Sequence, residues 1–358
     1  LAEYKKSVNM PLPWEGGWWR LGDIVDYEIS STMSIIKTCS SHKEDILTFR
    51  NELCKKEVRR GQTEAPYYFI FPKEQHDKSE LIDLVNLLDM HGVKRYTMEK
   101  PVLIESTQFN KGDVVIPLAQ PFRPFIKEVL EKQDFPIRHY TPGGEIIRPY
   151  DITSWSLPLH KGVNSYQIDK RNTELEEALV EINGKYQAAL SRIDDPAVFA
   201  FPFSNNESYK VAFLAKEKGL DVRYYKGKIE GINKSDNEGG FIIENTDSKK
   251  LDDLFSILNV EPIYLASIPE GAVELDFPKV GLIETYMHDM DAGWTRYVFD
   301  SYHIPYQVIR PGEIPEKELE DFDVLIFPDS RKSELLKGTY ERPGYYRMSS
   351  YPPEYSKG

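Results

Sequence analysis

Apolar residues near the start of the chain recur at helical spacing. They lie three or four positions apart, or at small multiples of that spacing, with polar residues between them. The stripe consists of Val25, Ile29, Met33, Ile36, Cys39, Leu47 and Cys54. This pattern predicts a helix from about Asp23 to Val58, with Asp23 as N-cap and the two cysteines as small core residues. Such a helix would exceed the usual length, so we expect a break near Ser40 and Ser41.

The residues before this helix are irregular but rich in tryptophan. Trp14, Trp18 and Trp19 stand among prolines and glycines, which predicts a segment folded onto an apolar surface. An irregular segment followed by one long helix is not enough to form a domain of its own. We therefore expect residues 1–62 to be the end of a domain whose beginning lies before Leu1.

From residue 63 onward, short apolar runs alternate with helical stripes. The run Tyr67–Phe71 precedes a helical stripe at 79–90, and strand-like runs at 93–96 and 114–116 precede another stripe at 121–132. Such alternation is typical of βαβ units covered by helices. It predicts an α/β fold with mainly parallel strand pairing.

The same succession returns further along the chain. Three pairs of landmarks share nearly one offset: Phe71 and Phe201 (130 positions), Gly92 and Gly219 (127), and Gly112 and Gly240 (128). The offset predicts two α/β repeats, at 63–147 and 197–278, with a junction and helix at 148–196 between them. Spacing alone leaves open whether the copies form two lobes or one continuous sheet.

A third region covers residues 279–358. Strand-like runs at 280–283, 306–309 and 323–328, with a helical stripe at 291–302, predict the first half of an open α/β sheet. Sheets of this kind have about five strands, so this domain looks truncated.

Composition narrows the classes of partner. Among 358 residues, 58 acidic residues outnumber 45 basic ones, and the net charge is −13. This balance argues against nucleic acid as a partner, because such binding relies on Lys and Arg that neutralise phosphates. The apolar runs are well below the ~20 residues of a membrane helix, and the first residues lack the zones of a signal peptide. We expect no membrane span, and the residues leave the compartment unknown.

Familiar catalytic motifs do not occur. None of the seven histidines is followed by Glu at the third position, as a short zinc pair requires. The nearest arrangement, His288 with Asp289 and Asp291, is better explained as the start of a helix. A nucleophile elbow and glycine-rich phosphate motifs are also missing, and neither cysteine lies in the α/β regions. We expect no catalytic residue, metal ligand or cofactor in this chain.

Five residues remain as candidate ligand contacts. Glu284 follows a predicted strand, and ligands of open α/β sheets gather at the carboxyl ends of strands. Tyr224 and Tyr225 offer stacking surfaces in the second repeat. Asp151 and Trp155 lie in the polar and aromatic stretch between the repeats, which is either a ligand site or a connector anchored by Trp155. No base, nucleophile or metal pair accompanies this stretch, and that favours the connector.

Three segments together resemble one family. They are Pro13–Glu28 (PWEGGWWRLGDIVDYE), Arg148–Leu159 (RPYDITSWSLPL) and Met290–Tyr297 (MDAGWTRY). In this order they are similar to the region that follows the catalytic core of large microbial zinc carboxypeptidases of the carboxypeptidase A superfamily. The resemblance implies a parent enzyme with an N-terminal metallopeptidase domain and a C-terminal domain similar to class I glutamine amidotransferases.

The resemblance also implies where the chemistry would lie. In such enzymes zinc activates water and a Glu acts as general base, but these residues would precede Leu1, so none can be assigned here. We therefore expect a non-catalytic accessory part, inactive alone, whose partners are its own catalytic domain and peptide substrate; relatives are often exported. A rival hypothesis is a stand-alone module that binds a peptide or saccharide in the cleft between the repeats. A third is an enzyme whose site the motifs do not reveal.

Overall fold

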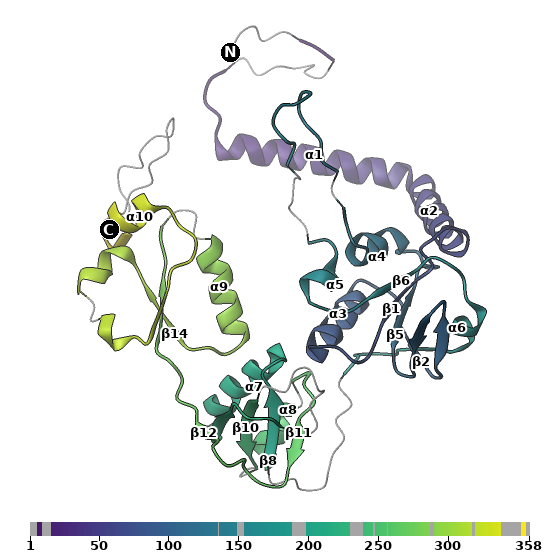
Figure 1. Cartoon of the computed structure of the whole chain (residues 1–358). Coiled ribbons are helices and arrows are strands. Elements are labelled where there is room, and N and C mark those ends of the chain that lie inside the picture. Colours follow the sequence, from purple (N-terminus) through teal and green to yellow (C-terminus); the bar gives the residue numbers. More distant parts are fainter. Residues whose placement is uncertain are drawn as a thin grey trace.

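In the computed structural model, two N-terminal helices precede three α/β units (Figure 1). The structure describes residues 6–8, 16–134, 136–148, 154–187, 198–229, 239–245, 248–255, 257–286, 290–316, 319–337 and 352–355. Among the residues singled out in the sequence, the candidate ligand contact Asp151 lies outside these ranges, as do Trp14, His288 and Asp289.

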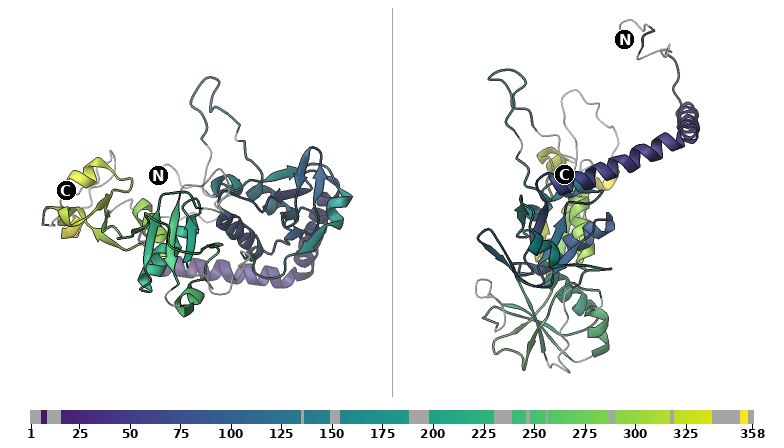
Figure 2. Two further views of the ribbon diagram at one scale, coloured as in Figure 1. Left: turned by 60° about the horizontal axis from the view of Figure 1, so that its bottom comes forward. Right: turned by 90° about the vertical axis from the view of Figure 1, so that its right-hand side faces the viewer.

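The N-terminal helices are α1 (Leu21–Ser41) and α2 (Lys43–Thr63), and the chain bends between them at His42. The predicted break near Ser40 and Ser41 is therefore confirmed to within two residues. Only the carboxyl-terminal part of α2 packs on the first unit, through the buried Glu57 and Gly61. Helix α1 has no buried residue and extends away from the first sheet (Figure 2).

The first unit is built on a five-stranded sheet with strand order β6-β1-β5-β2-β7, in which every pairing is antiparallel. A small hairpin, β3 with β4, lies outside this sheet. The elements of the unit are β1 (Tyr68–Phe71), α3 (Lys78–Met90), β2 (Tyr96–Met98), β3 (Val102–Ile104), β4 (Thr107–Phe109), β5 (Val114–Pro117), α4 (Arg123–Leu130), α5 (Leu157–His160), β6 (Tyr166–Ile168), α6 (Thr173–Glu177) and β7 (Leu179–Glu181).

The second unit repeats this topology in its own separate sheet. Its strand order is β11-β8-β10-β9-β12, and each strand has the place and direction of one strand of the first sheet. The elements are β8 (Val198–Pro202), α7 (Asn206–Glu217), β9 (Val222–Tyr225), β10 (Gly240–Glu244), α8 (Ser248–Phe255), β11 (Ile263–Leu265) and β12 (Val273–Glu274).

The predicted parallel pairing is wrong for both five-stranded sheets. The crossover from β1 through α3 to β2 does make those two strands parallel, but β5 lies between them and is antiparallel to both. Strand β10 separates β8 from β9 in the same way. This is a split βαβ arrangement. In each unit the helical crossover makes the two strands that it joins parallel. A strand that comes later in the chain, β5 or β10, then pairs between them.

Burial on both faces explains why the strands resembled those of a parallel sheet. All four residues of β1 are buried: Phe69 and Phe71 pack beneath α3 and α4, and Tyr68 and Ile70 face the β3–β4 hairpin and α6. A strand covered on both faces is apolar throughout whatever the direction of its neighbours, although such runs are most typical of parallel sheets.

The third unit contains a three-stranded parallel sheet of order β14-β13-β15. Parallel pairing among the named strands is confined to this sheet. Its elements are β13 (Val280–Ile283), α9 (Met290–Ser301), β14 (Tyr306–Ile309), the 3-10 turns η1 (Pro311–Glu316) and η2 (Leu319–Asp321), β15 (Val324–Ile326), α10 (Lys332–Lys337) and η3 (Pro353–Tyr355).

The first two units meet where α3 and α7 begin. The carboxylate of Asp77 caps α3 by accepting a hydrogen bond from the Ser79 backbone N–H (2.9 Å), and its other oxygen accepts from the Asn206 N–H (2.7 Å), the first residue of α7. One buried carboxylate therefore serves the positive ends of two helices in different units.

The residues just after α9 bring the third unit against the other two. His303 Nδ1 lies 2.9 Å from Glu217 Oε2 on α7. Tyr302, one residue earlier, is half-buried, and its phenol has a pKa raised to about 12 by burial and by the negative charges of Glu80, Glu207 and Asp77. Part of each unit thus borders the same charged region.

Candidate functional site

The carboxyl edge of the parallel sheet holds Glu284, as the strand pattern predicted. Glu284 follows β13, is 9% exposed, and accepts a hydrogen bond from Arg296 Nη1 on α9 at 2.8 Å. Tyr355 Oη, from η3, lies 3.3 Å from the other carboxylate oxygen and also accepts a hydrogen bond from Arg310 Nε at 3.0 Å. Glu284 is thus engaged by an arginine and a tyrosine, and its contacts hold α9 and η3 against the sheet.

The two predicted stacking tyrosines do not form one platform. Tyr224 packs against the core beneath α7 and α8, whereas Tyr225 packs against the core on the opposite face of the sheet. Neighbouring residues of a strand point to opposite faces, so Tyr224 and Tyr225 cannot stack on one ligand side by side.

The stretch around Trp155 joins the first unit. Trp155 is half-buried, and the next residue, Ser156, is buried and donates its hydroxyl to the Glu131 carbonyl at 2.7 Å. Leu157 then packs against the core beneath α3 and α4. These contacts tie the stretch to the first unit beside α4, whereas Tyr224 and Tyr225 belong to β9 of the second unit.

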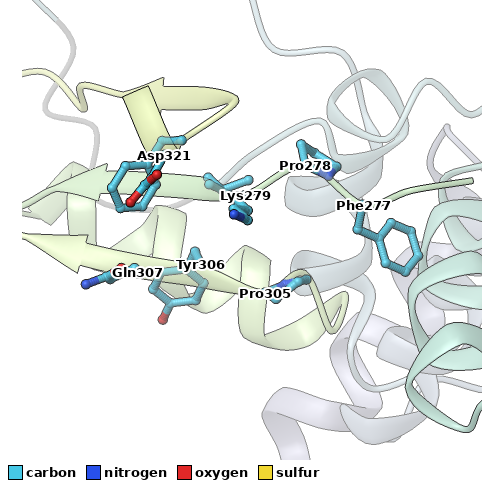
Figure 3. Close-up of a pocket in the computed structure, with 9 residues that line it drawn as sticks. Phe277, Pro278, Lys279, Pro305, Tyr306, Gln307 and Asp321 are labelled. Atoms are coloured by element: carbon cyan, nitrogen blue, oxygen red, sulfur yellow. The ribbon is translucent and has the colours of Figure 1, made fainter. Parts of the chain in front are cut away.

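A cavity of ≈ 570 Å³ lies at the amino edge of the parallel sheet, where the second unit leads into the third (Figure 3). Phe277 and Pro278 form one side, and Lys279, Tyr306 and Asp321 lie on the other. Ligands of open α/β sheets bind at the opposite, carboxyl edge. The cavity is better explained as space around the linker, where Phe277 stacks on Phe213 of α7 at 4.2 Å between ring centres.

Helix α1 presents an apolar surface that the fold does not explain. Seven apolar side chains, between 40% and 77% exposed, lie along roughly half of its circumference. We call this surface the α1 face; it consists of Leu21, Ile24, Val25, Ile29, Met33, Ile35 and Ile36.

Further exposed apolar residues lie just before α1 and in α2, which follows it. Trp18, just before the helix, is 81% exposed, and Ile46, Leu47, Phe49 and Leu53 of α2 are exposed as well. The expectations that the tryptophan segment covers an apolar surface and that Cys39 is a core residue are therefore wrong for Trp18 and Cys39, which are both exposed. The helical stripe was recognisable, but the sequence did not show that no described part of the chain covers it.

The composition of α1 makes its exposure more unusual. It contains four Ile, one Val, five Ser and two Thr among 21 residues, all weaker helix formers than Ala, Leu or Lys. Helices in proteins owe most of their stability to the packing of an apolar face. Helix α1 therefore needs a partner surface both to hide its apolar residues and to remain helical.

Metal and membrane chemistry receive no support from the described part of the chain. Within it, no group of three or more His, Cys, Asp and Glu side chains could hold a metal ion. The same described residues contain no helix that is both long and apolar enough to cross a bilayer.

Compared with family models, curated proteins and solved structures, the chain matches none of them. Its possible function must therefore be argued from its own residues and geometry. Among the described surfaces, the α1 face is the one that most needs a functional explanation.

Proposed function

We propose that this chain is the non-catalytic accessory part of a zinc carboxypeptidase-like protein, and that the α1 face docks on the catalytic domain. The observation that carries the proposal is a 21-residue helix with an apolar face and no buried residue. Burying one such side chain is worth roughly 1.5–3 kcal/mol, so seven of them supply a substantial interface.

The family resemblance supports the choice of partner. The segment Pro13–Glu28, which resembles the region directly after a carboxypeptidase catalytic core, includes Trp18, Leu21, Ile24 and Val25 of the exposed surface. One of the three segments that suggest the family thus contributes four residues to the surface that nothing in the described chain covers. Zinc and its general base belong, in this proposal, to the partner domain.

The charge of α1 argues against a lipid surface as its occupant. Helices that lie on membranes usually carry Lys and Arg on their polar side. Helix α1 carries Asp23, Asp26 and Glu28 but only one basic residue, Lys37. A protein surface fits this helix better than an anionic membrane.

Binding measurements with a matched pair of variants test the proposal. The chain would be mixed with the zinc carboxypeptidase domain encoded nearest to it in the same genome, and binding followed by analytical ultracentrifugation. Ile29→Asp with Ile36→Asp should weaken the complex at least about tenfold, because two charges enter an apolar interface. Ser30→Asp with Ser34→Asp, on the opposite side of α1, should leave it unchanged.

Two results would count against docking on a catalytic domain. One is equal binding by both variants. The other is self-association of the chain alone that only the isoleucine variant abolishes, which would make a second copy the occupant. Reading the gene upstream of Leu1 for His-x-x-Glu and a distant His tests the family assignment separately.

A further inference from the structure

A second cavity of ≈ 570 Å³ lies at the boundary of the first and second units. Its walls come from the loop after β1, from α3, from β2 and from the turn before β5, and the second unit contributes Asn259 and Glu261. The volume is in the range of pockets that hold small organic ligands.

The charges on one wall of this cavity are balanced. Lys78 Nζ lies 3.3 Å from Glu74 Oε2 and 3.5 Å from Glu261 Oε2. This triad links α3 to the second unit, and its cation is matched by two carboxylates. A charged ligand would therefore gain little binding energy from Lys78.

The other charged residues of the lining are Lys73, Lys111 and the exposed Glu99. Lys73 and Lys111 both line the cavity and are exposed, and within the described chain neither ammonium group has a carboxylate at ion-pair distance. Asp113 holds the two segments together: it is 2% exposed, and its oxygens accept hydrogen bonds from the backbone N–H groups of Lys73 (2.9 Å) and Asn110 (2.7 Å).

The local backbone lets the two lysines share one rim. Gly112 has a φ of +95°, and a Cβ there would lie 3.1 Å from Cδ of Lys73. The Lys73 stem therefore lies across the turn that carries Lys111. The rim thus carries two ammonium groups against the single carboxylate of Glu99, in a chain of net charge −13.

The interior of the cavity is apolar with a few polar groups. Leu81, Ile82 and Met98 are buried residues of its floor, and Thr97 and Asn259 add hydrogen-bonding side chains. Such a floor suits an aliphatic or aromatic side chain, while the amide and hydroxyl groups suit a peptide backbone better than a plain hydrocarbon chain.

We propose that this cavity binds the carboxyl-terminal end of a short peptide, with its free carboxylate at Lys73 and Lys111 and its last apolar side chain on the floor formed by Leu81, Ile82 and Met98. The carboxylate supplies the ion-pair partner that Lys73 and Lys111 lack within the described chain. The cavity shares no residue with the α1 face, so peptide binding here can be tested independently of the docking proposal.

Calorimetric titration of the full chain with an acetylated Ala-Ala-Phe peptide tests the proposal. The free acid should bind at least about tenfold more tightly than the same peptide with an amidated carboxyl terminus. Lys73→Gln with Lys111→Gln should remove that difference. Lys170→Gln, which alters an exposed ion pair with Glu105 that does not line the cavity, should preserve it.

The comparison of acid and amide uses the unaltered chain, so it does not depend on any variant folding. Equal binding of acid and amide, or no binding of the acid at millimolar concentration, overturns the proposal. Tighter binding of octanoate than of the peptide overturns the assignment to peptides. An equal loss of affinity in Lys170→Gln overturns the assignment of the two rim lysines.

Discussion

At the scale of single residues, Gly61 shows how closely α2 approaches the first unit. A Cβ at this position would lie 2.2 Å from the Leu118 carbonyl oxygen and 2.5 Å from Ala119 Cα, both backbone atoms. A side chain cannot move such neighbours aside cheaply. The absence of a Cβ therefore allows the end of α2 to pack beside the turn before α4.

Gly61→Ala should destabilise the chain by about 1–3 kcal/mol, the usual cost of overpacking a close contact. Gly22→Ala is the matched control, because Gly22 is also helical but a Cβ added there would meet no atom within 4 Å. It should instead stabilise α1 by up to about 1 kcal/mol. Urea unfolding of both variants would measure this, and equal effects of the two would contradict the close approach.

At the scale of secondary-structure elements, Asp77 joins helices α3 and α7. It caps α3 within its own unit and also accepts from the first N–H of α7 in the next. Asn205, at the corresponding position of the second unit, caps α7 through the Glu207 N–H at 3.1 Å, and the same oxygen accepts a hydrogen bond from Ser79 Oγ of the first unit at 2.9 Å. The two repeats thus share a capping position and both use it to link the units, but only Asp77 accepts from a backbone N–H of the other unit's helix.

Asp77→Ala should cost about 2–3 kcal/mol, because it removes one cap of about 1 kcal/mol and leaves the Asn206 N–H at the start of α7 without its acceptor. Asn205→Ala should cost only about 1 kcal/mol. Chemical unfolding followed by circular dichroism measures both. A smaller loss for Asp77→Ala than for Asn205→Ala would show that the carboxylate does not bridge the helices.

At the scale of the whole molecule, the ionisation of Tyr302 reports how the third unit meets the other two. Its phenol follows α9, yet part of the rise in its pKa comes from Glu80 and Asp77 of the first unit and Glu207 of the second. A third unit held elsewhere would not experience these charges.

Subtracting the titration of Tyr302→Phe from that of the wild type isolates the signal of Tyr302. This tyrosine should titrate with a pKa of about 12, above the ordinary tyrosine value of 10.0. Because the folded pKa is raised, the folded state holds this proton longer than the unfolded state, so stability should fall as the pH rises from about 10 towards 12. A difference titration of tyrosinate absorbance measures the shift. A midpoint near 10 would contradict the arrangement of the units.

Much of the local structure could be predicted from the sequence. The stripe from Val25 to Cys54 located both N-terminal helices and their break, and the landmarks around Phe71 and Phe201 led to the pair of related units. The position of Glu284 at the end of β13 was also predictable, because a strand end can be read from its apolar run. Its engagement by Arg296 and Tyr355 was not, since those residues follow it by 12 and 71 positions.

The sequence by itself determined where most helices and the strands of four or five residues form, because those preferences depend on residues three or four positions apart and on which faces are apolar. The two- and three-residue strands β3, β4, β6, β7, β11 and β12 were too short for such a pattern. Only the tertiary structure decided which strands pair, because β5 reaches its place between β1 and β2 through contacts that no local pattern encodes. For the same reason, the pattern identified the apolar stripe of α1, but the three-dimensional arrangement showed that none of the described units covers it.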